Sequence, residues 1–417
     1  MSTGALDNTT MTPPDHTNGG NGGALPGARP LTPPPPPPPP RSLWATALVD
    51  TFRNRRAQVS AVWIGLLVIC AVFAPFIANT HPLLMKRDGH WSSPALHYLV
   101  PADVMLLAVF VLTLAFLFAR RVPYRGWIYA GLVLVAIVLS YTLVPRRDVP
   151  NYAVYRQAAA AGKIQAAIYA PVRFSPLDRQ FEREDVLLNA PSAQNWLGTD
   201  SNGADVASRI IHAARIALAV GFIATGIEVV IGVIVGGLMG YFVGKVDLLG
   251  MRLIEIFEAI PTLFLLITFT AFYKRDLYMI MAIIGLTSWT GVARFVRGEF
   301  LRLRNLDFVH AARAAGLPLH SVLFRHMLPN ALTPVLVSAS FGVAQAILLE
   351  SVLSFLGLGL VEEPSWGGML EQARSAGRFI WWLAVFPGMA IFLTVFAYNL
   401  IGESMRDALD PKLRGIE

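Results

Sequence analysis

Two carboxylates lie inside long apolar stretches of this 417-residue chain. Glu228 stands among valines and isoleucines, and Glu350 follows a run rich in alanine and leucine. A charge inside a bilayer is costly unless it faces protein, water or another ion, so acids at such positions often mark a transport pathway. A neutral or hydrogen-bonded acid can instead brace neighbouring helices. Both residues are therefore candidate pathway or gate residues, with bracing as the alternative for each.

Motifs for catalysis and for nucleotide binding are missing from the sequence. The string that comes nearest to a phosphate-binding loop, Gly240–Val246, has the wrong glycine spacing and no Ser or Thr after its lysine. The eight histidines lack metal-ligand spacing, and no Gly-x-Ser-x-Gly elbow occurs. The single cysteine, Cys70, excludes an intrachain disulfide. We expect no catalytic residue, bound cofactor or metal in this chain.

One apolar stretch carries four glycines at intervals of four residues, namely Gly232, Gly236, Gly240 and Gly244. This spacing removes side chains along one ridge of a helix, so that a second helix can approach closely. A sliding interface between two halves of a transporter and static helix packing both fit the pattern. We favour static packing and assign the four glycines to it.

An arginine-rich inner segment, residues 297–333, separates two apolar stretches, and residues 306–330 lie within it. The string D-F-V-H-A-A-R-A-A at Asp307–Ala315 predicts a helix with an alanine face, and Gly316 predicts its end. A second short helix is expected at about 319–327, closed by Pro329. The alanine face would allow close docking of another protein, and the arginines around it would orient an acidic partner. An amphipathic loop on anionic lipid is the alternative. The arginines are Arg294, Arg297, Arg302, Arg304, Arg313 and Arg325.

The elements that position these residues follow from the composition. Hydrophobic residues make up 54% of the chain and charged residues 15%, whereas soluble proteins carry roughly 25% charged residues. Eight apolar runs could cross a bilayer as helices. They cover approximately residues 59–78, 104–118, 127–144, 216–243, 254–272, 277–296, 332–356 and 380–401. The sequence predicts an all-α polytopic membrane protein. The net charge of +7 comes from arginines that flank the runs, so we expect no nucleic-acid partner.

Lysines and arginines gather in alternate short loops between the apolar runs. The positive-inside rule then places both termini and the 306–330 segment in the cytoplasm. Residues 145–213 form an outer segment, with a helix-like stretch at Tyr155–Tyr169. Asp200 is expected to cap the helix that leads into the fourth run.

Residues 1–42 are mostly small, polar, glycine or proline and include eight consecutive prolines, Pro33–Pro40. This composition predicts a disordered, extended cytoplasmic tail. The tail has no apolar segment of the kind found in a cleavable signal peptide, so we expect the first apolar run to act as the insertion signal.

The 306–330 segment resembles the cytoplasmic coupling loop of permease subunits in ABC importers, whose pattern is E-A-A-x3-G-x9-I-x-L-P. Ala311–Ala312, Gly316 and Leu328–Pro329 match that pattern. The form R-H-M-L-P-N is similar to the dipeptide and oligopeptide class. His310 replaces the family's Glu, and His326 replaces its Ile. By this resemblance the ATPase-coupling residues are Asp307, His310, Ala311, Ala312, Ala315, Gly316, Arg325, His326, Leu328 and Pro329.

The resemblance extends over roughly residues 195–414. It includes the strings L-G-T-D at 197–200, S-F-L-G-L-G at 354–359 and S-W-G at 365–367, and Glu350 matches a family acid. The amino-acid sequence at residues 170–174 and 195–198 is most similar to that of the oligopeptide and microcin C branch. The resemblance implies a six-helix permease core, to which residues 104–144 add an inserted transmembrane hairpin.

The same resemblance implies a function and its partners. The chain would be the non-catalytic permease subunit of a peptide importer in the bacterial inner membrane. Its partners would be a second permease subunit, two ATP-binding cassette subunits that use ATP and Mg, and an extracytoplasmic peptide-binding protein. Di- and oligopeptides, including microcin C-like peptides, would be the substrates.

The predicted organisation has five parts. They are the tail 1–42, a first transmembrane helix in 43–80, the extra hairpin 81–144, the extracytoplasmic segment 145–213 and the permease core 214–417 with its coupling loop 297–333. Two other functions remain open, namely an ion-coupled secondary transporter or channel that uses Glu228 or Glu350, and a membrane anchor for a cytosolic enzyme.

Overall fold

A computed structural model of the chain divides into two units, Met1–Arg41 and Ser42–Glu417. The described residues all belong to the second unit. They are 49–87, 89–118, 124–145, 152–180, 186–273, 276–360 and 363–409, without the side chain of Thr333. The predictions for the tail 1–42 and for the part of the family resemblance after residue 409 lie outside the described residues.

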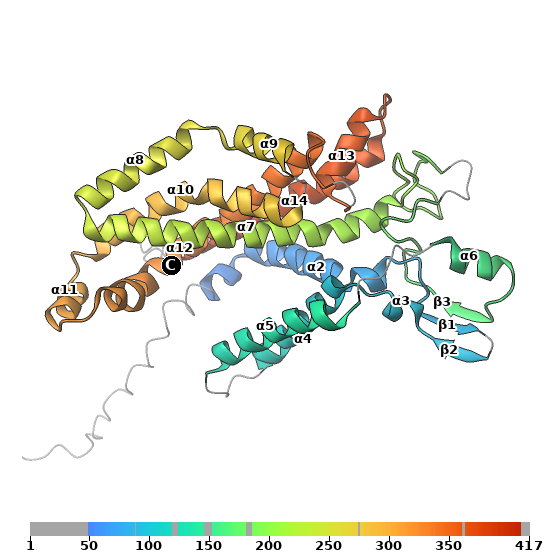
Figure 1. The fold of residues 1–417 in the computed structure, drawn as a ribbon, viewed down its shortest axis with the longest axis horizontal. Coiled ribbons are helices and arrows are strands. Elements are labelled where there is room, and N and C mark those ends of the chain that lie inside the picture. The colour runs from blue at the N-terminus through green and yellow to red at the C-terminus, as the bar shows by residue number, and fades with distance from the viewer. Residues whose placement is uncertain are drawn as a thin grey trace, which may run out of the picture. The chain divides into compact units, whose positions relative to one another are not determined.

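Seven helices in the described residues are long and apolar enough to cross a membrane. They are α2 (Arg55–Ile77), α4 (Pro101–Phe118), α5 (Arg125–Leu143), α7 (Val206–Phe242), α10 (Leu277–Leu303), α12 (Leu328–Phe355) and α14 (Trp381–Leu409). A pair of helices, α8 (Lys245–Ala259) and α9 (Thr262–Phe272), is long and apolar enough only when both are taken together, and the two are bent by 70° relative to each other. Each coincides with a predicted apolar run, and the all-α polytopic membrane fold is confirmed (Figure 1).

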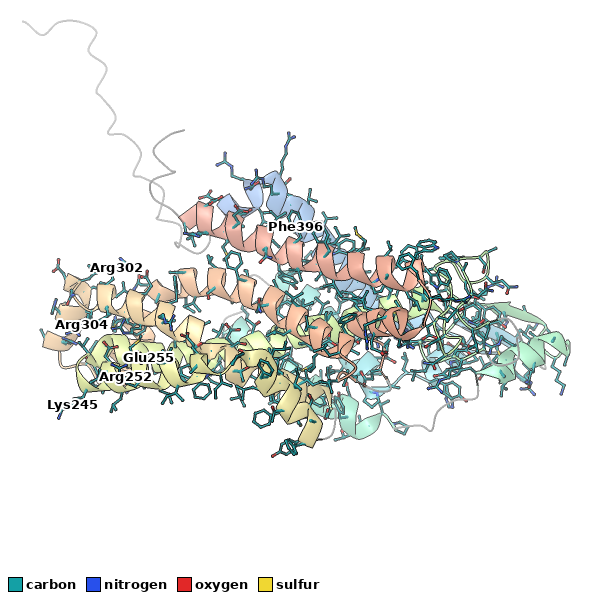
Figure 2. The ribbon with its side chains drawn as sticks, turned by 90° about the horizontal axis from the view of Figure 1, so that it is seen from above. Lys245, Arg252, Glu255, Arg302, Arg304 and Phe396 are labelled. Carbon is teal, nitrogen blue, oxygen red and sulfur yellow. The ribbon has the colours of Figure 1, made fainter. Side chains whose placement is uncertain are left out.

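The bend between α8 and α9 falls at Ile260 and Pro261. A proline has no backbone N–H to donate to the preceding turn, so α8 ends before Pro261 and α9 begins after it. Figure 2 shows Lys245, Arg252 and Glu255 of α8 toward the same end of this unit as Arg302 of α10.

The shorter elements include a small sheet that the sequence did not predict. Strands β1 (Leu84–Arg87), β2 (His90–Ser92) and β3 (Ala166–Ile168) are antiparallel in the order β2-β1-β3, and Leu84 pairs with Ile168. The predicted helix at Tyr155–Tyr169 is wrong in its second half. The helix there, α6 (Ala153–Ala160), stops before Gly162, whose φ of 67° is not helical. The remaining short helices are α3 (Pro94–His97), α11 (Asp307–Ala314), the π-helix η1 (Ser321–Met327) and α13 (Trp366–Ser375).

The glycine ridge of α7 packs against α10. A Cβ on Gly236 would overlap the backbone carbonyl of Ala293, and one on Gly240 would lie 2.6 Å from the carbonyl oxygen of Arg297. Gly232 meets Val292 in the same way. Gly244 does not belong to this packing ridge as predicted. It has a φ of 65° and lies at the start of α8, and a Cβ added to it would meet no atom within 4 Å. Its role is to turn the chain.

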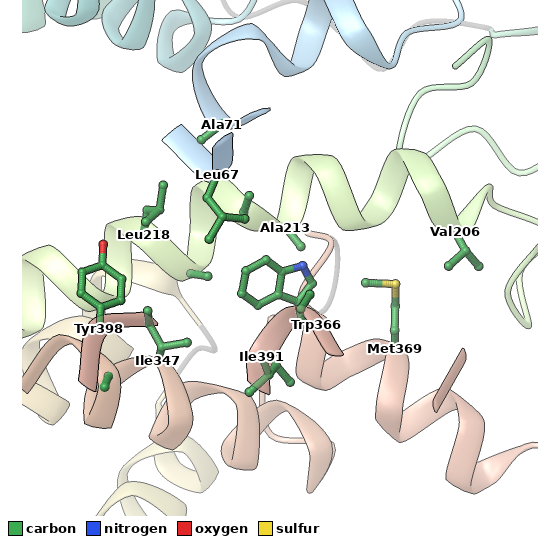
Figure 3. Packing of buried hydrophobic residues seen from close by; sticks show 14 of the residues in the cluster. Leu67, Ala71, Val206, Ala213, Leu218, Ile347, Trp366, Met369, Ile391 and Tyr398 are labelled. Carbon is green, nitrogen blue, oxygen red and sulfur yellow. The ribbon is translucent and has the colours of Figure 1, made fainter. Parts of the chain in front are cut away.

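A cluster of buried residues joins α2, α7, α12, α13 and α14. Figure 3 shows Trp366 of α13 in the middle of this cluster, with Leu67 of α2 on one side and Ile391 of α14 on the other. The indole N–H of Trp366 donates to the carbonyl of Ile210 at 3.2 Å, so its one polar atom is satisfied. This cluster holds the beginning of α7 to the C-terminal helices.

The cap of α7 differs from the prediction. Asp205 is the N-cap, since its carboxylate accepts the backbone N–H of Ser208 at 2.8 Å. Asp200 instead accepts the N–H groups of Asn202 and Ala204 and forms an ion pair with Arg209 at 2.6 Å. Asp200 therefore shapes the turn before the helix.

Candidate functional site

The 306–330 segment lies at the end of the long helices that is opposite to the three-stranded sheet (Figure 1). It consists of α11, a turn, η1 and the first residues of α12. Asp307 lies in the first turn of α11, where the negative charge of a carboxylate interacts favourably with the helix dipole.

Helix α11 ends as the sequence predicted. Gly316 has a φ of 70°, and its N–H donates to the carbonyl of Arg313 at 2.9 Å. The N–H of Leu317 donates to the carbonyl of Ala312 at 3.2 Å. These two bonds form a Schellman motif, which satisfies the last carbonyls of the helix and fixes the direction of the chain after it.

The second predicted helix does not close at Pro329. Residues Ser321–Met327 form a π-helix that continues directly into α12, and the N–H of Leu328 donates to Leu323, five residues before it. Pro329 lies in the first turn of α12, where a missing N–H leaves no gap in the helix. The segment is thus continuous with the membrane-spanning helix α12.

Packing joins the segment to α10 and α12 as one body. Val309 and Ala312 of α11 belong to a buried cluster that also contains residues of three other helices. Those residues are Val292, Val296, Phe300 and Leu303 of α10, Val322, Leu323 and Met327 of η1, and Ala331 and Val335 of α12. A displacement of α11 must therefore displace the ends of both long helices.

This packing also revises the predicted alanine face. Ala312 is only 6% exposed and faces the segment's own core, whereas Ala311 and Ala315 are exposed. Apolar side chains extend the exposed surface, with Phe324 the most exposed at 53%. The other exposed ones are Leu306, Phe308, Leu317 and Leu319. Of the remaining predicted residues, Asp307, His310, Gly316, Arg325 and Pro329 are exposed, and His326 and Leu328 are half-buried. The surface is more apolar than predicted.

The predicted basic rim is largely neutralised within the chain. Arg294, Arg297 and Arg302 form ion pairs with Glu258, Asp247 and Glu299, respectively. Arg313 lies over the ring of Tyr241. Among the described residues, Arg304 and Arg325 have no such partner, so they are the cations left to face an acidic protein. Figure 2 shows Arg302 and Arg304 near the same end of the unit.

A cavity of about 250 Å³ lies beside the segment, and its lining was not predicted. Its walls come from α7, α10, η1 and α12, and they are Val233, Ile234, Gly237, Leu238, Phe300, Leu323, Phe324 and Leu328. All eight residues are apolar or glycine, so the cavity offers a polar substrate no hydrogen-bonding side chain.

The two intramembrane acids lie apart from each other. Glu350 is 3% exposed and accepts the hydroxyl of Ser354 at 2.6 Å. Glu228 is half-buried and faces α12 at Gly342, where an added Cβ would lie 3.0 Å from its Oε2. Eight residues of α12, roughly 12 Å of helix rise, separate Gly342 from Glu350. The two acids therefore form no shared site.

Glu350 sits in a tight junction between α12 and the chain that follows it. A Cβ on Gly359 would overlap the Ser354 hydroxyl, and one on Gly367 would overlap the carbonyl of Ser351. This geometry favours a bracing role for Glu350. Glu228 has no hydrogen-bond partner within the described part of the chain, which keeps it as the better pathway candidate.

A buried polar cluster near the sheet was not predicted. The hydroxyl of Thr80 donates to Asp178 at 2.6 Å, and Arg156 bonds both oxygens of the same carboxylate. His81 is 3% exposed, and its ring stacks on Tyr98 at 4.3 Å. Burial lowers the pKa of His81 to about 4, although the charge of Asp178 acts in the opposite direction. No local signal could reveal this cluster, because its members come from distant parts of the sequence.

Two parts of the amino-acid sequence match known protein families. Residues 232–415 match the family described as binding-protein-dependent transport system inner membrane component. Residues 42–94 match the N-terminal TM domain of oligopeptide transport permease C.

This chain aligns with most of the length of three curated relatives. The inner membrane ABC transporter permease protein YejE of Escherichia coli is 33% identical over 363 residues, which is 86% of this chain and 95% of the relative. The oligopeptide transport system permease protein OppC of Haemophilus influenzae is 39% identical, over 62% of this chain and 86% of the relative. The glutathione transport system permease protein GsiD of Pectobacterium atrosepticum is 39% identical, over 55% of this chain and 77% of the relative.

Proposed function

The chain belongs to the family of binding-protein-dependent transport system inner membrane components, as a permease of the peptide-type ABC importers, and we propose that it forms a peptide pathway with a second permease subunit. Two cytosolic ATP-binding cassette subunits would drive the cycle with ATP and Mg. An extracytoplasmic binding protein would deliver di- or oligopeptides, including microcin C-like peptides. The chain itself contributes no catalytic residue.

One observation carries this proposal, namely the packing of the 306–330 segment as one body with α10 and α12. A partner that grips the exposed face around Ala311 and Ala315 can displace two long helices together. ATP binding supplies the difference in affinity between two states that such a displacement requires. The helices then alternate between openings on the two sides of the membrane.

The proposal fixes an orientation in the bacterial inner membrane. Both termini and the α11 end face the cytoplasm, in agreement with the positive-inside rule. The sheet and α6 lie outside the cell membrane, within reach of the binding protein. The organisation follows the five predicted parts, with helices α4 and α5 as the inserted hairpin of a six-helix core.

An ion-coupled transporter or channel is the second candidate, and it is favoured by Glu228, whose carboxylate has no hydrogen-bond partner among the described residues. Such a protein would work without ATPases, and its rate would follow an ion gradient. The membrane-anchor function predicts no transport at all.

Reconstitution separates these functions. The chain, a second permease, the ATPases and the binding protein are placed in proteoliposomes, and uptake of labelled tripeptide is measured. We expect uptake only when ATP and all subunits are present. Uptake that persists without the ATPases, or that follows a proton gradient alone, would contradict the proposal.

Variants at the 306–330 segment sharpen this test. Ala312→Pro breaks α11 inside its buried cluster and should abolish coupling or assembly. Ala312→Ser keeps a small side chain that fits a helix at the same position and should leave most of the uptake intact. A channel that needs no ATPase would conduct with either variant.

A further inference from the structure

Helix α8 packs loosely against the rest of the unit. Of its fifteen residues, all of them described, Ile254 alone is buried. Leu248, Leu249 and Ile256 are exposed, and Figure 1 shows α8 diverging from α7 and α10 on its way to α9. Ile254 packs with Met239 of α7 and Trp289 of α10, and polar contacts at the two ends of α8 add to this apolar attachment.

Two of these contacts join α8 to α10. Arg297 bonds both oxygens of Asp247, with Nη2 at 2.7 Å from Oδ2, at the beginning of α8. Arg294 forms an ion pair with Glu258 at the end of α8. Helix α10 leads directly into the 306–330 segment, so both contacts connect α8 to the same body.

The third contact joins the corner before α8 to α11. The Nε of Arg313 donates to the hydroxyl of Tyr241 at 3.2 Å, and its guanidinium carbon lies 4.7 Å from the centre of the tyrosine ring. A guanidinium over an aromatic face is held by the ring's quadrupole as well as by the hydrogen bond. This contact bridges 72 residues of sequence.

The surroundings of Tyr241 make it a firm attachment point. The preceding Gly240 lies against the backbone of Arg297 and leaves no room for a side chain. The residues that follow the α7 end, Val243 with a φ of 52° and Gly244 with a φ of 65°, reverse the chain into α8. Positive φ at a valine is uncommon, so this corner is fixed by its contacts and not by local preference. Tyr241 therefore stands between the end of α7 and the turn into α8.

We infer that Tyr241 and Arg313 are positioning residues that carry a displacement of the 306–330 segment into α8, so that α8 and α9 move together with α11 when the importer changes state. This inference rests on the proposed function, in which ATPases displace that segment. The bends at Val243–Gly244 and Ile260–Pro261 are the two ends about which α8 turns. The part of the chain that moves then includes α8 and α9 in addition to α10, α11 and α12.

Distances between spin labels test this inference in the assembled importer. The single native cysteine is replaced by Cys70→Ser, and labels are attached at Ala315, directly after α11, or at Leu249 of α8, which is 70% exposed. A second label at Ile69 of α2 serves as the reference. Pulsed electron resonance then gives each distance with and without bound ATP.

In the wild-type background, both labels should shift relative to Ile69 when ATP binds. Tyr241→Leu removes the ring and the hydroxyl, so the Ala315 label should still shift fully, while the Leu249 shift should become clearly smaller because only Arg294 and Arg297 still join α8 to the moving body. Peptide transported per ATP hydrolysed should fall by about tenfold. Tyr241→Phe keeps the aromatic face and should recover most of both signals. Arg252→Ala, which removes an ion pair within α8, should behave as wild type.

The outcomes separate the inference from the function on which it rests. Equal Leu249 shifts in wild type and Tyr241→Leu, together with an unchanged transport ratio, would overturn the inference alone. An Ala315 label that never responds to ATP would overturn the proposed function. If Tyr241→Leu fails to assemble, Arg313→Gln removes the same contact from the other side and carries the same two readouts. The double variant should uncouple transport no further than either single variant.

Discussion

The guanidinium group of Arg215 on α7 forms a buried ion pair with the carboxylate of Asp103 at the start of α4. The side chains are 16% and 7% exposed, and the Nε of Arg215 also donates to the carbonyl of Ala71 on α2. One arginine thus joins α4 to both α7 and α2. Because most of α4 and α5 is exposed, this ion pair is a main attachment of the hairpin.

Asp103→Ala should therefore loosen the hairpin. The variant leaves the Arg215 charge buried and unpaired, which costs about 3 to 5 kcal/mol in a protein interior. We expect a lower melting temperature in detergent and faster proteolysis between α4 and α5. Adding Arg215→Leu should restore part of the loss, because the unpaired charge is gone. An unchanged melting temperature for Asp103→Ala would show that the ion pair does not hold the hairpin.

The glycine ridge gives a prediction with an internal control. Gly236→Ala would force a Cβ into the carbonyl of Ala293, and separating α7 from α10 should destabilise the protein by about 1 to 3 kcal/mol. Gly226→Ala is on the same helix and meets no atom within 4 Å. It should be neutral or slightly stabilising, since alanine favours helix. Thermal unfolding of both variants measures the difference, and equal effects would refute the close-packing role.

The cluster around His81 predicts a pH dependence. Its pKa falls from the ordinary 6.5 to about 4 in the folded chain, so the unfolded chain binds the proton more tightly. The stabilisation is therefore complete above pH 6.5 and is lost as the pH falls toward 4, with a slope of up to about 1.4 kcal/mol per pH unit.

Thermal unfolding of the whole chain between pH 7 and pH 4 checks this dependence. His81→Gln should reduce the slope of the pH profile, because glutamine does not titrate and one of the titrating groups is then gone. Tyr98→Phe keeps the stacked ring and the histidine, so its profile should follow that of wild type. A His81→Gln profile as steep as that of wild type would assign the pH dependence to other groups.

The bracing role of Glu350 predicts that its charge is dispensable. Glu350→Gln keeps an oxygen that accepts the Ser354 hydroxyl, so uptake should stay within about twofold of wild type. Glu350→Leu removes the acceptor inside a tight junction and should destabilise the chain. Uptake and melting temperature report the two effects. Loss of uptake in Glu350→Gln at normal stability would instead assign a transport role to the carboxylate.

Local features of the sequence were sufficient for much of this fold. Each membrane-spanning helix is an apolar run that can be recognised without knowing its neighbours. The end of α11 follows from Gly316, which adopts a positive φ that other residues rarely take. The ridge of Gly232, Gly236 and Gly240 was likewise visible in its spacing.

Features that depend on distant partners were not predictable. Three of the arginines predicted to face a partner protein, Arg294, Arg297 and Arg313, are instead engaged by residues that lie 36, 50 and 72 positions away in sequence. Asp205 is the N-cap because it directly precedes the first residue of α7, whereas Asp200 pairs with Arg209. Nor could composition show that Ala312 faces inward, because that depends on how α11 packs against α10 and η1.

Site-directed cross-linking of the exposed face of α11 tests the central claim most directly. A cysteine is placed at Ala311 in the Cys70→Ser chain within intact membranes, and a short bifunctional reagent is added. The account predicts a cross-link to an ATP-binding cassette subunit, and labelling of the cysteine by impermeant maleimide only from the cytoplasmic side. Labelling from the outside, or a fully assembled importer in which no ATPase cross-link forms, would contradict it.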